Sequence, residues 1–332
     1  MKFVRDIGEV GLIARLSRRL PRGTGVEVGI GDDAAVLGPP SRARLLFACD
    51  MLVEGTHFLL APPSSSRGKR WAGRGRTPAR WIGWKALAVN VSDIAAMGGM
   101  PRWAVVSLGL PPATPLRFAD ELYAGLSRCA QRFGVSIVGG DTVRASRIII
   151  DVAILGTVAA GRAILRSGAA PGDVLFVTGR LGGSSESGRH ARFVPRLAES
   201  HALLRRVRVR AMMDLSDGLA SDLWQMSRAG GVRLRVEASR VPVAGAARRC
   251  RRRGCRCRVA RNLGPVYHAL MDGEDFELLF AVRPRDVARV PRRLRGCLVT
   301  PIGRAVSRGV GVELVHPDGR VRPLLPTGFK HF

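Results

Sequence analysis

The amino-acid sequence predicts a protein of two domains in the α/β or α+β class. Its 332 residues are enough for two domains, and its apolar content of 46% is typical of a globular chain with a full core. Predicted strands and helices alternate in both halves. Because this pattern restarts near residue 160, we expect one domain over residues 1–160 and a second over residues 161–332.

The elements of the first half follow from the spacing of apolar residues. This spacing indicates helices over residues 9–20, 81–97 and 118–133, and strands over 45–50, 104–110, 135–138 and 147–158. The helix over 81–97 has the clearest apolar stripe, and it holds Asn90 and Asp93 three residues apart on another face. Pro, Ser, Gly and Arg dominate residues 61–80, which we interpret as a mobile loop.

The second half repeats the alternation. Apolar runs predict strands over residues 173–179, 211–214, 276–282 and 297–303. Basic helical stretches are expected over 192–208 and between the last two strands, and a further helix over 218–228.

The chain is strongly basic, with 54 Lys and Arg residues against 26 Asp and Glu residues. Such a charge attracts anions, including nucleotides and nucleic acids, without selecting among them. The Arg runs at 67–80 and 248–261 suggest a nucleic-acid-binding protein, but they lack interleaved aromatic residues. No apolar run is long enough for a transmembrane helix and the N-terminus lacks a signal-peptide pattern, so we expect a cytoplasmic protein without a membrane partner.

The six cysteines form no C-x-x-C pair. Three of them, Cys250, Cys255 and Cys257, lie in an Arg-rich run, where a zinc site is conceivable but lacks a nearby second pair of ligands.

Acidic residues gather in a few short motifs. Several adjoin Gly, Ser or Thr at the predicted end of a strand or start of a helix, where the backbone can approach a ligand closely. Adjacent carboxylates repel unless a cation or water screens them. Taken singly, each motif has a simpler interpretation, since Asp217 could cap a helix and Asp141 could form a turn. Together they favour a site for several Mg²⁺ ions and a polyphosphate. The residues concerned are Asp32, Asp33, Asp50, Glu54, Asp93, Asp141, Asp214, Asp217, Asp222, Asp272, Glu274, Asp275 and Glu277.

Common phosphate-binding and nucleophile motifs are missing. The sequence has no G-x-x-x-x-G-K-[ST], no kinase catalytic-loop signature and no G-x-S-x-G. An ATP-dependent enzyme with this sequence would hold its phosphates with metals and glycine-rich turns.

The motifs resemble those of the thiamine-monophosphate kinases, in the superfamily that includes aminoimidazole ribonucleotide synthase. The resemblance runs through GIGDDAAVL (29–37), CDMLVEGTHF (49–58), WKALAVNVSDIAAMGGMP (84–101), VGGDTVR (138–144), GRAILRSGAAPGD (161–173), MMDLSDGLASDL (212–223), DGEDFELLF (272–280) and GFKHF (328–332). Their order and combination are highly specific, whereas GGD alone is not.

The resemblance implies an activity and an architecture. The activity is Mg²⁺-dependent, direct in-line transfer of the γ-phosphoryl group of ATP to thiamine monophosphate, which gives thiamine diphosphate in the last step of its biosynthesis. The architecture is an aminoimidazole ribonucleotide synthase-like fold, in which two N-terminal domains form a β-barrel across a homodimer and the active site lies between the domains.

The resemblance also assigns roles to residues. It implies metal ligands at Asp33, Cys49, Asp50, Asp93, Asp141, Asp214 and Asp217. Contacts to ATP are implied for Gly140, Asp141, Arg166 and Ser216, and contacts to thiamine monophosphate for His57, Glu274 and Phe329. Cys49 stands where the family has Ser or Thr, so its backbone carbonyl is the ligand atom that remains. An aromatic face such as that of Phe329 suits a cationic thiazolium ring.

Other members of the superfamily fit the sequence less well. Selenophosphate synthetase needs a reactive N-terminal Cys or selenocysteine, and Cys49 is the first thiol in this chain. The hydrogenase-maturation dehydratase needs a C-terminal Cys, whereas this sequence ends in His331 and Phe332. The DGEDFE and GFKHF motifs also favour the thiamine kinase over aminoimidazole ribonucleotide synthase.

Overall fold

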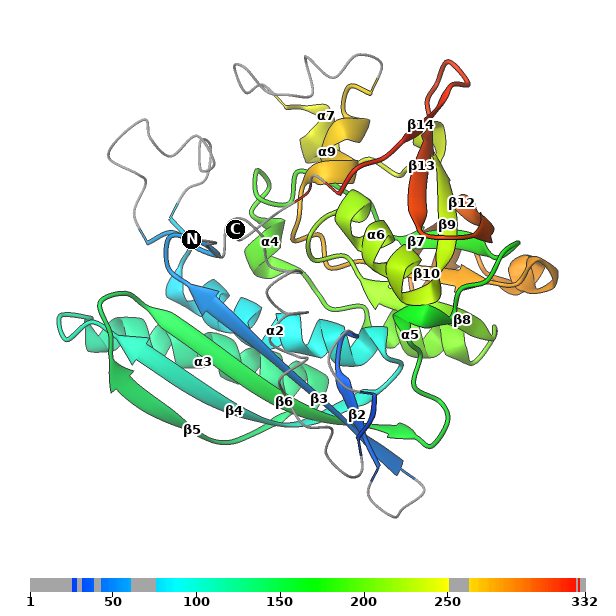
Figure 1. Cartoon of the computed structure of the whole chain (residues 1–332). Helices are drawn as coiled ribbons and strands as arrows, with labels where there is room; N and C mark the ends of the chain where they lie inside the picture. The colour runs from blue at the N-terminus through cyan, green and yellow to red at the C-terminus, as the bar shows by residue number, and fades with distance from the viewer. Residues whose placement is uncertain are drawn as a thin grey trace, which may run out of the picture.

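A computed structural model describes residues 26–28, 32–38, 43–60, 76–250, 263–326 and 328. The chain forms two sheets, each with its own helices, and helix α2 (Ala79–Ala96) lies between them (Figure 1). Several expectations fall outside the described residues: the helix over 9–20, the loop over 61–75, Cys255, Cys257 and Phe329.

The first sheet has six strands in the order β1-β2-β3-β6-β4-β5. Its long central pairs are antiparallel, whereas β4 and the edge strand β5 run parallel. The sheet is open in the described chain. The strands are β1 (Val26–Val28), β2 (Ala35–Leu37), β3 (Ala43–Val53), β4 (Met100–Leu110), β5 (Ser136–Arg144) and β6 (Ile149–Ala159).

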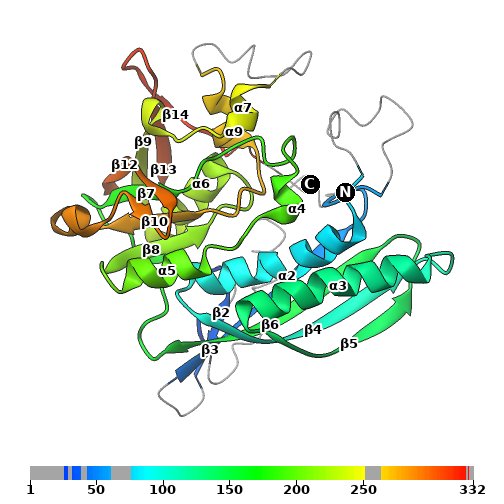
Figure 2. The ribbon, with the colours of Figure 1, turned by 180° about the vertical axis from the view of Figure 1, so that it is seen from behind.

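Helices α2 and α3 (Leu116–Phe133) cover one face of this sheet (Figure 2). Fifteen of the 18 residues of α2 are buried, because the sheet, α3 and the C-terminal half all pack around it. The apolar stripe predicted on this helix is buried, but residues on its other faces are buried as well, and Arg80 near its start is exposed. The helices approach closely at two glycines: a Cβ atom on Gly83 would lie 1.9 Å from the carbonyl oxygen of Leu122.

The opposite face of the first sheet is apolar and uncovered in the described chain. Successive residues of β3 alternate between the helix-covered face and the open face, as a strand requires. On the open side, Phe47 is 45% exposed and Trp103 is 44% exposed. Val105, Val138 and Val143 are also exposed large apolar side chains on β4 and β5.

The second sheet has eight strands and runs β14-β13-β9-β12-β7-β10-β8, with β11 paired to β12. Its strands are β7 (Val174–Thr178), β8 (Val209–Asp214), β9 (Val232–Glu237), β10 (Leu278–Val282), β11 (Arg293–Leu294), β12 (Cys297–Arg308), β13 (Gly311–Val315) and β14 (Val321–Pro323). The helical segments of this half are η1 (Arg166–Gly168), α4 (Arg189–Arg192), α5 (Leu197–Leu204), α6 (Leu219–Gly230), η2 (Ala238–Arg240), α7 (Gly245–Arg248), α9 (Val266–Met271) and η3 (Pro284–Arg289).

Two apolar clusters hold this half together. Helices α6 and α9 pack on one face of the sheet, and α5 packs on the other. The cluster beneath α5 includes Ala96 from the end of α2, so the two halves share buried contacts. None of the helices in the described ranges is long and apolar enough to span a membrane.

The structure corrects several expected elements. The strand expected to end at 138 continues as β5 through the GGDT motif to Arg144. The helix expected over 192–208 is shorter, because α4 ends at Arg192 and only α5 (Leu197–Leu204) lies within the span. The basic helix expected before the last strand is the 3-10 turn η3 followed by β11. Strands β9, β13 and β14 were not expected, because exposed Arg and Glu residues interrupt their apolar pattern.

Candidate active site

A pocket of about 290 Å³ lies where α2, the ends of β3 and β8, and the segments before β2 and β10 meet. It is mostly polar, and most of its charged side chains are carboxylates. The residues from the sequence-predicted site that line it are Asp33, Cys49, Asp50, His57, Asp93, Arg166, Asp214, Ser216, Asp217 and Glu274. Sequence motifs up to 240 residues apart therefore contribute to one pocket.

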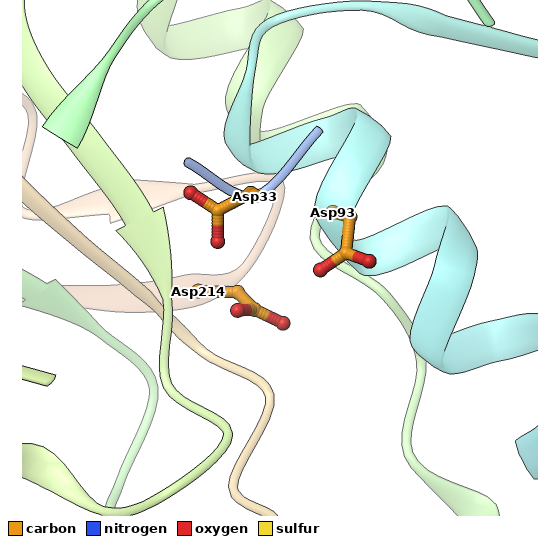
Figure 3. A group of neighbouring side chains, drawn as sticks. All are labelled: Asp33, Asp93 and Asp214. Atoms are coloured by element: carbon orange, nitrogen blue, oxygen red, sulfur yellow. The ribbon is translucent and has the colours of Figure 1, made fainter. Parts of the chain in front are cut away.

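Three carboxylates form the centre of the pocket. Asp33 precedes β2, Asp93 is on α2 and Asp214 ends β8, and one ligand atom from each lies within 4.8 Å of the others (Figure 3). Figure 3 shows the three carboxylate groups turned toward a common space. Carboxylate oxygens gathered at this spacing are the donor set that hard divalent cations prefer.

Burial and mutual repulsion raise the pKa values of these acids. Burial raises the pKa of Asp214 to about 8, with a further contribution from Asp33. Burial, then the charges of Asp50 and Asp214, raises the pKa of Asp93 well above its usual range. A carboxyl–carboxyl hydrogen bond joins Asp93 to Asp50, and the Ser92 hydroxyl donates to Asp214 at 2.6 Å. A bound cation would favour the ionised forms instead.

Arg166 is the basic side chain that pairs with this acidic cluster. Its guanidinium donates to both carboxylate oxygens of Asp33, at 3.0 and 2.9 Å, and its Nη1 donates to Gln225 at 2.6 Å. Its backbone N–H also donates to Asp32 at 3.1 Å. This bidentate pair fixes the guanidinium at the mouth of the acidic cluster, a geometry that also suits phosphate oxygens.

The LSDG segment positions Ser216 and Asp217. Helix α6 begins at Leu219, and its N-cap position is Gly218, one residue after Asp217. Asp217 accepts a hydrogen bond from Gln225 at 3.2 Å and faces the pocket. Gly218 has φ 104°, a conformation that favours glycine, and it turns the chain from β8 into the helix.

Lys85 is a pocket residue that sequence reasoning missed. It is 1% exposed on α2, forms an ion pair with Glu274, and donates to the carbonyl oxygen of His57 at 3.0 Å. It thus connects two of the three residues that the resemblance assigns to thiamine monophosphate. The available signal was a Lys within a largely apolar helical run, because a buried Lys needs a charged partner.

Only one acid of the DGEDFE motif lines the pocket. Glu274 lines the pocket with φ 64°, an uncommon conformation for a residue other than glycine. Asp272 and Asp275 accept hydrogen bonds from the backbone of Gly183 and Gly182 at 2.9 and 2.7 Å, and Glu277 pairs with Arg196. These three acids hold the loop, so the expectation that they belong to the metal site is wrong.

Some predicted residues lie elsewhere. Gly140 and Asp141 are on the edge strand β5, two strands beyond β6, which pairs with β3. At about 4.8 Å per strand, Asp141 is about 14 Å across the sheet from β3. A Cβ atom on Gly140 would lie 1.8 Å from the Val106 carbonyl oxygen, so packing alone requires this glycine. Asn90 is buried and donates to Ala86, away from the pocket.

Comparison with known proteins identifies the family. Residues 31–158 match the family model described as AIR synthase related protein, N-terminal domain, and residues 170–316 match the corresponding C-terminal domain. The chain is 36% identical to the thiamine-monophosphate kinase of Rhodopirellula baltica, over 95% of this chain and 93% of that one. It is 34% identical to the Escherichia coli K12 kinase, over 98% of both chains. The chain belongs to the thiamine-monophosphate kinase family.

Solved structures agree with this assignment. The structure of AaThiL complexed with AMPPCP and TMP is 29% identical in sequence, covers 100% of this chain and 99% of its own, and superposes with a TM-score of 0.81. The hydrogenase-maturation protein HypE of E. coli reaches a TM-score of 0.66 at 21% identity, and this likeness shows the shared fold alone.

Proposed function

We propose that this chain phosphorylates thiamine monophosphate to thiamine diphosphate with ATP, by direct transfer of the γ-phosphoryl group. The observation that carries the proposal is the convergence of the family motifs on one acidic pocket in a chain of this family. A structural relative was solved with AMPPCP and TMP, which correspond to a nucleotide and an acceptor.

The pocket residues fit Mg²⁺ as the metal. Asp33, Asp93 and Asp214 offer oxygens within 4.8 Å of one another, and Asp50 and Asp217 line the same pocket. We assign these five carboxylates, with the backbone of Cys49, to the metal site. When bound, Mg²⁺ would neutralise the charge on the phosphate oxygens and help hold them in line.

The remaining pocket residues divide between donor and acceptor. Arg166 and Ser216 line the pocket beside the acidic cluster, where Arg166 would contribute positive charge to the phosphates of ATP. Lys85 holds Glu274 and the His57 backbone together on the other side, where we place the acceptor. Phosphoryl transfer depends mainly on positioning and charge, so no separate general base is required.

We also propose that the protein acts as a homodimer through the open face of the first sheet. This face exposes Phe47, Trp103 and Val105, side chains that a monomer rarely leaves together in water. A β-barrel formed by two such sheets would cover them. Gly140 and Asp141 stay predicted ATP contacts, and Asp141 also stays a predicted metal ligand. Because they lie about 14 Å from β3, a bound nucleotide would have to span the sheet or meet a second copy. A cytoplasmic location stays a prediction.

Product identification tests the proposal. The purified protein is incubated with ATP, Mg²⁺ and either thiamine monophosphate or free thiamine, and the products are separated by chromatography. We expect thiamine diphosphate and ADP in equal amounts from the monophosphate and little turnover of thiamine. Equal use of free thiamine, or no product from either acceptor, would refute the proposal.

A further inference from the structure

A second, larger cavity lies at the junction of the two halves, outside the acidic pocket. Its volume is about 1050 Å³, and it is bounded by the end of β6, the connection over 161–168, the end of α5 and the start of β8. Figure 1 shows β6 ending beneath α5 and β8. Pockets for small molecules commonly reach this size and commonly form between domains.

Five arginines line this cavity and no acidic residue does: Arg162, Arg205, Arg206, Arg208 and Arg210. Within the part of the chain that the structure describes, Arg162, Arg205, Arg206 and Arg208 form no side-chain hydrogen bond or ion pair. The Nε atom of Arg210 lies 3.5 Å from a carboxylate oxygen of Asp173, an ion pair without hydrogen-bond geometry. Arg162, Arg205, Arg206 and Arg208 are exposed, so water screens their charges, and a bound anion with several charges would pair with them.

The cavity also has an apolar wall. Met100, Ile164, Leu165 and Leu204 line it beside the arginines. A ligand that fits the cavity carries two or more negative charges to pair with the arginines, and an uncharged part to pack on the apolar wall. A single nucleic-acid strand fits less well, because such sites stack bases on aromatic rings and no Phe, Tyr or Trp lines this cavity.

One short segment separates the two pockets. Arg166 points into the acidic pocket and pairs with Asp33, whereas its neighbours Leu165 and Ser167 line the basic cavity. The segment is bonded to both halves: Ile164 donates to the Met97 carbonyl at 3.1 Å, and Met212 donates to the Leu165 carbonyl at 3.3 Å. The basic cavity is therefore a separate site at the point where the halves join.

We propose that this basic cavity binds a phosphorylated small organic molecule of the nucleoside diphosphate type. Its phosphates pair with Arg206, Arg208 and their neighbours, and its uncharged part lies against Ile164 and Leu204. This binding does not depend on the proposed phosphoryl transfer. The basic cavity can therefore be tested independently of the kinase activity.

Binding without divalent metal tests the site. In EDTA the carboxylates of the acidic pocket repel phosphates, so calorimetric titration with ADP or pyrophosphate reports the basic cavity. We expect ADP to bind, more tightly than pyrophosphate, and the double variant Arg206→Gln/Arg208→Gln to weaken ADP at least tenfold. The control Arg285→Gln/Arg308→Gln removes the same charge from two exposed arginines outside the cavity and should change affinity less than twofold.

Four results would overturn the proposal. The first is absence of ADP binding, and the second is equal weakening in the control variant, which would indicate general attraction to a basic surface. The third is loss of binding in Arg166→Gln but not in the double variant, which would move ADP to the acidic pocket. The fourth is tight binding of a single-stranded RNA with none of ADP. Thermal melts of each variant confirm that it is folded.

Discussion

At the scale of single residues, the pocket combines acids that repel one another with two cations that pair with them, a buried Lys and a half-buried Arg. Arg166 neutralises Asp33 and Lys85 neutralises Glu274. Most of the predicted site residues could be identified from sequence because each motif places an acid beside small residues. Lys85 could not be assigned a role, since its partner Glu274 is 189 positions away and only the fold joins them.

Replacing Lys85 by Met should impair binding of the acceptor more than binding of ATP. The substitution removes the Lys85–Glu274 ion pair and the hydrogen bond from Lys85 to the His57 carbonyl oxygen. We expect KM for thiamine monophosphate to rise at least tenfold while KM for ATP changes less than threefold. Removing one member of a buried ion pair also costs stability, roughly 3 kcal/mol or more, measurable by urea unfolding.

A double variant that removes both charges of the ion pair is the control for Lys85→Met. The double variant Lys85→Met/Glu274→Gln should recover part of the lost stability, because no buried charge is left unpaired. Acceptor binding should stay weak in it. Equal loss of affinity for ATP and acceptor in Lys85→Met would contradict a role on the acceptor side.

At the scale of elements, α2 organises the molecule because it is buried on every side and carries Lys85, Ser92 and Asp93 to the pocket. Its limits, and those of α3, were predicted nearly to the residue from apolar spacing and from Gly134, whose φ of 68° ends α3. Strands β9 and β13 were not predicted because only alternate residues are buried, and the positions between them carry Arg and Glu in β9 and Glu313 in β13. The loop acids of DGEDFE were misassigned because sequence does not reveal which carboxylates face backbone N–H groups.

Substitution of Gly83 by Ala should separate α2 from α3. The added Cβ atom would lie 1.9 Å from the Leu122 carbonyl, so the helix backbones must move apart. We expect a loss of about 2 kcal/mol in unfolding free energy, within the usual range for overpacking. Gly125→Ala, whose Cβ atom would lie 1.9 Å from the Arg80 carbonyl, should behave alike. The exposed change Ala124→Ser on the same helix is the control, and a loss as large there would contradict this account.

At the scale of the whole molecule, the open face of the first sheet predicts self-association. Phe47→Glu or Val105→Glu should convert a dimer into a monomer in sedimentation velocity at micromolar concentration, because a buried unpaired charge is costly. The control Leu116→Glu alters an equally apolar but isolated side chain, 84% exposed on α3. A wild-type protein that sediments as a monomer would contradict the proposed interface.

The stability of the metal-free protein should fall as pH rises from about 5 to about 8.5. Folding raises the pKa of Asp214 to about 8 and that of Asp32 to about 7, so the folded state binds more protons than the unfolded state in this window. The stabilisation is complete below the unfolded pKa near 4 and is lost as pH passes the folded values. Melting temperatures in EDTA check this, and Asp214→Asn should flatten the slope. An unchanged slope in that variant would contradict the assignment.

The central claim is that the acidic pocket holds Mg²⁺ and ATP, and Asp93→Asn tests it most directly. The variant keeps the side-chain shape but removes a charge from the cluster formed with Asp33 and Asp214. We expect kcat/KM to fall by about 10² or more, roughly 3 kcal/mol in barrier, and the Mg²⁺–ATP shift in melting temperature to shrink. Stability without metal should stay the same or rise, since repulsion is relieved. Asp120→Asn on the exposed side of α3 is the control. Wild-type kcat/KM with a full Mg²⁺–ATP shift in Asp93→Asn would contradict the claim.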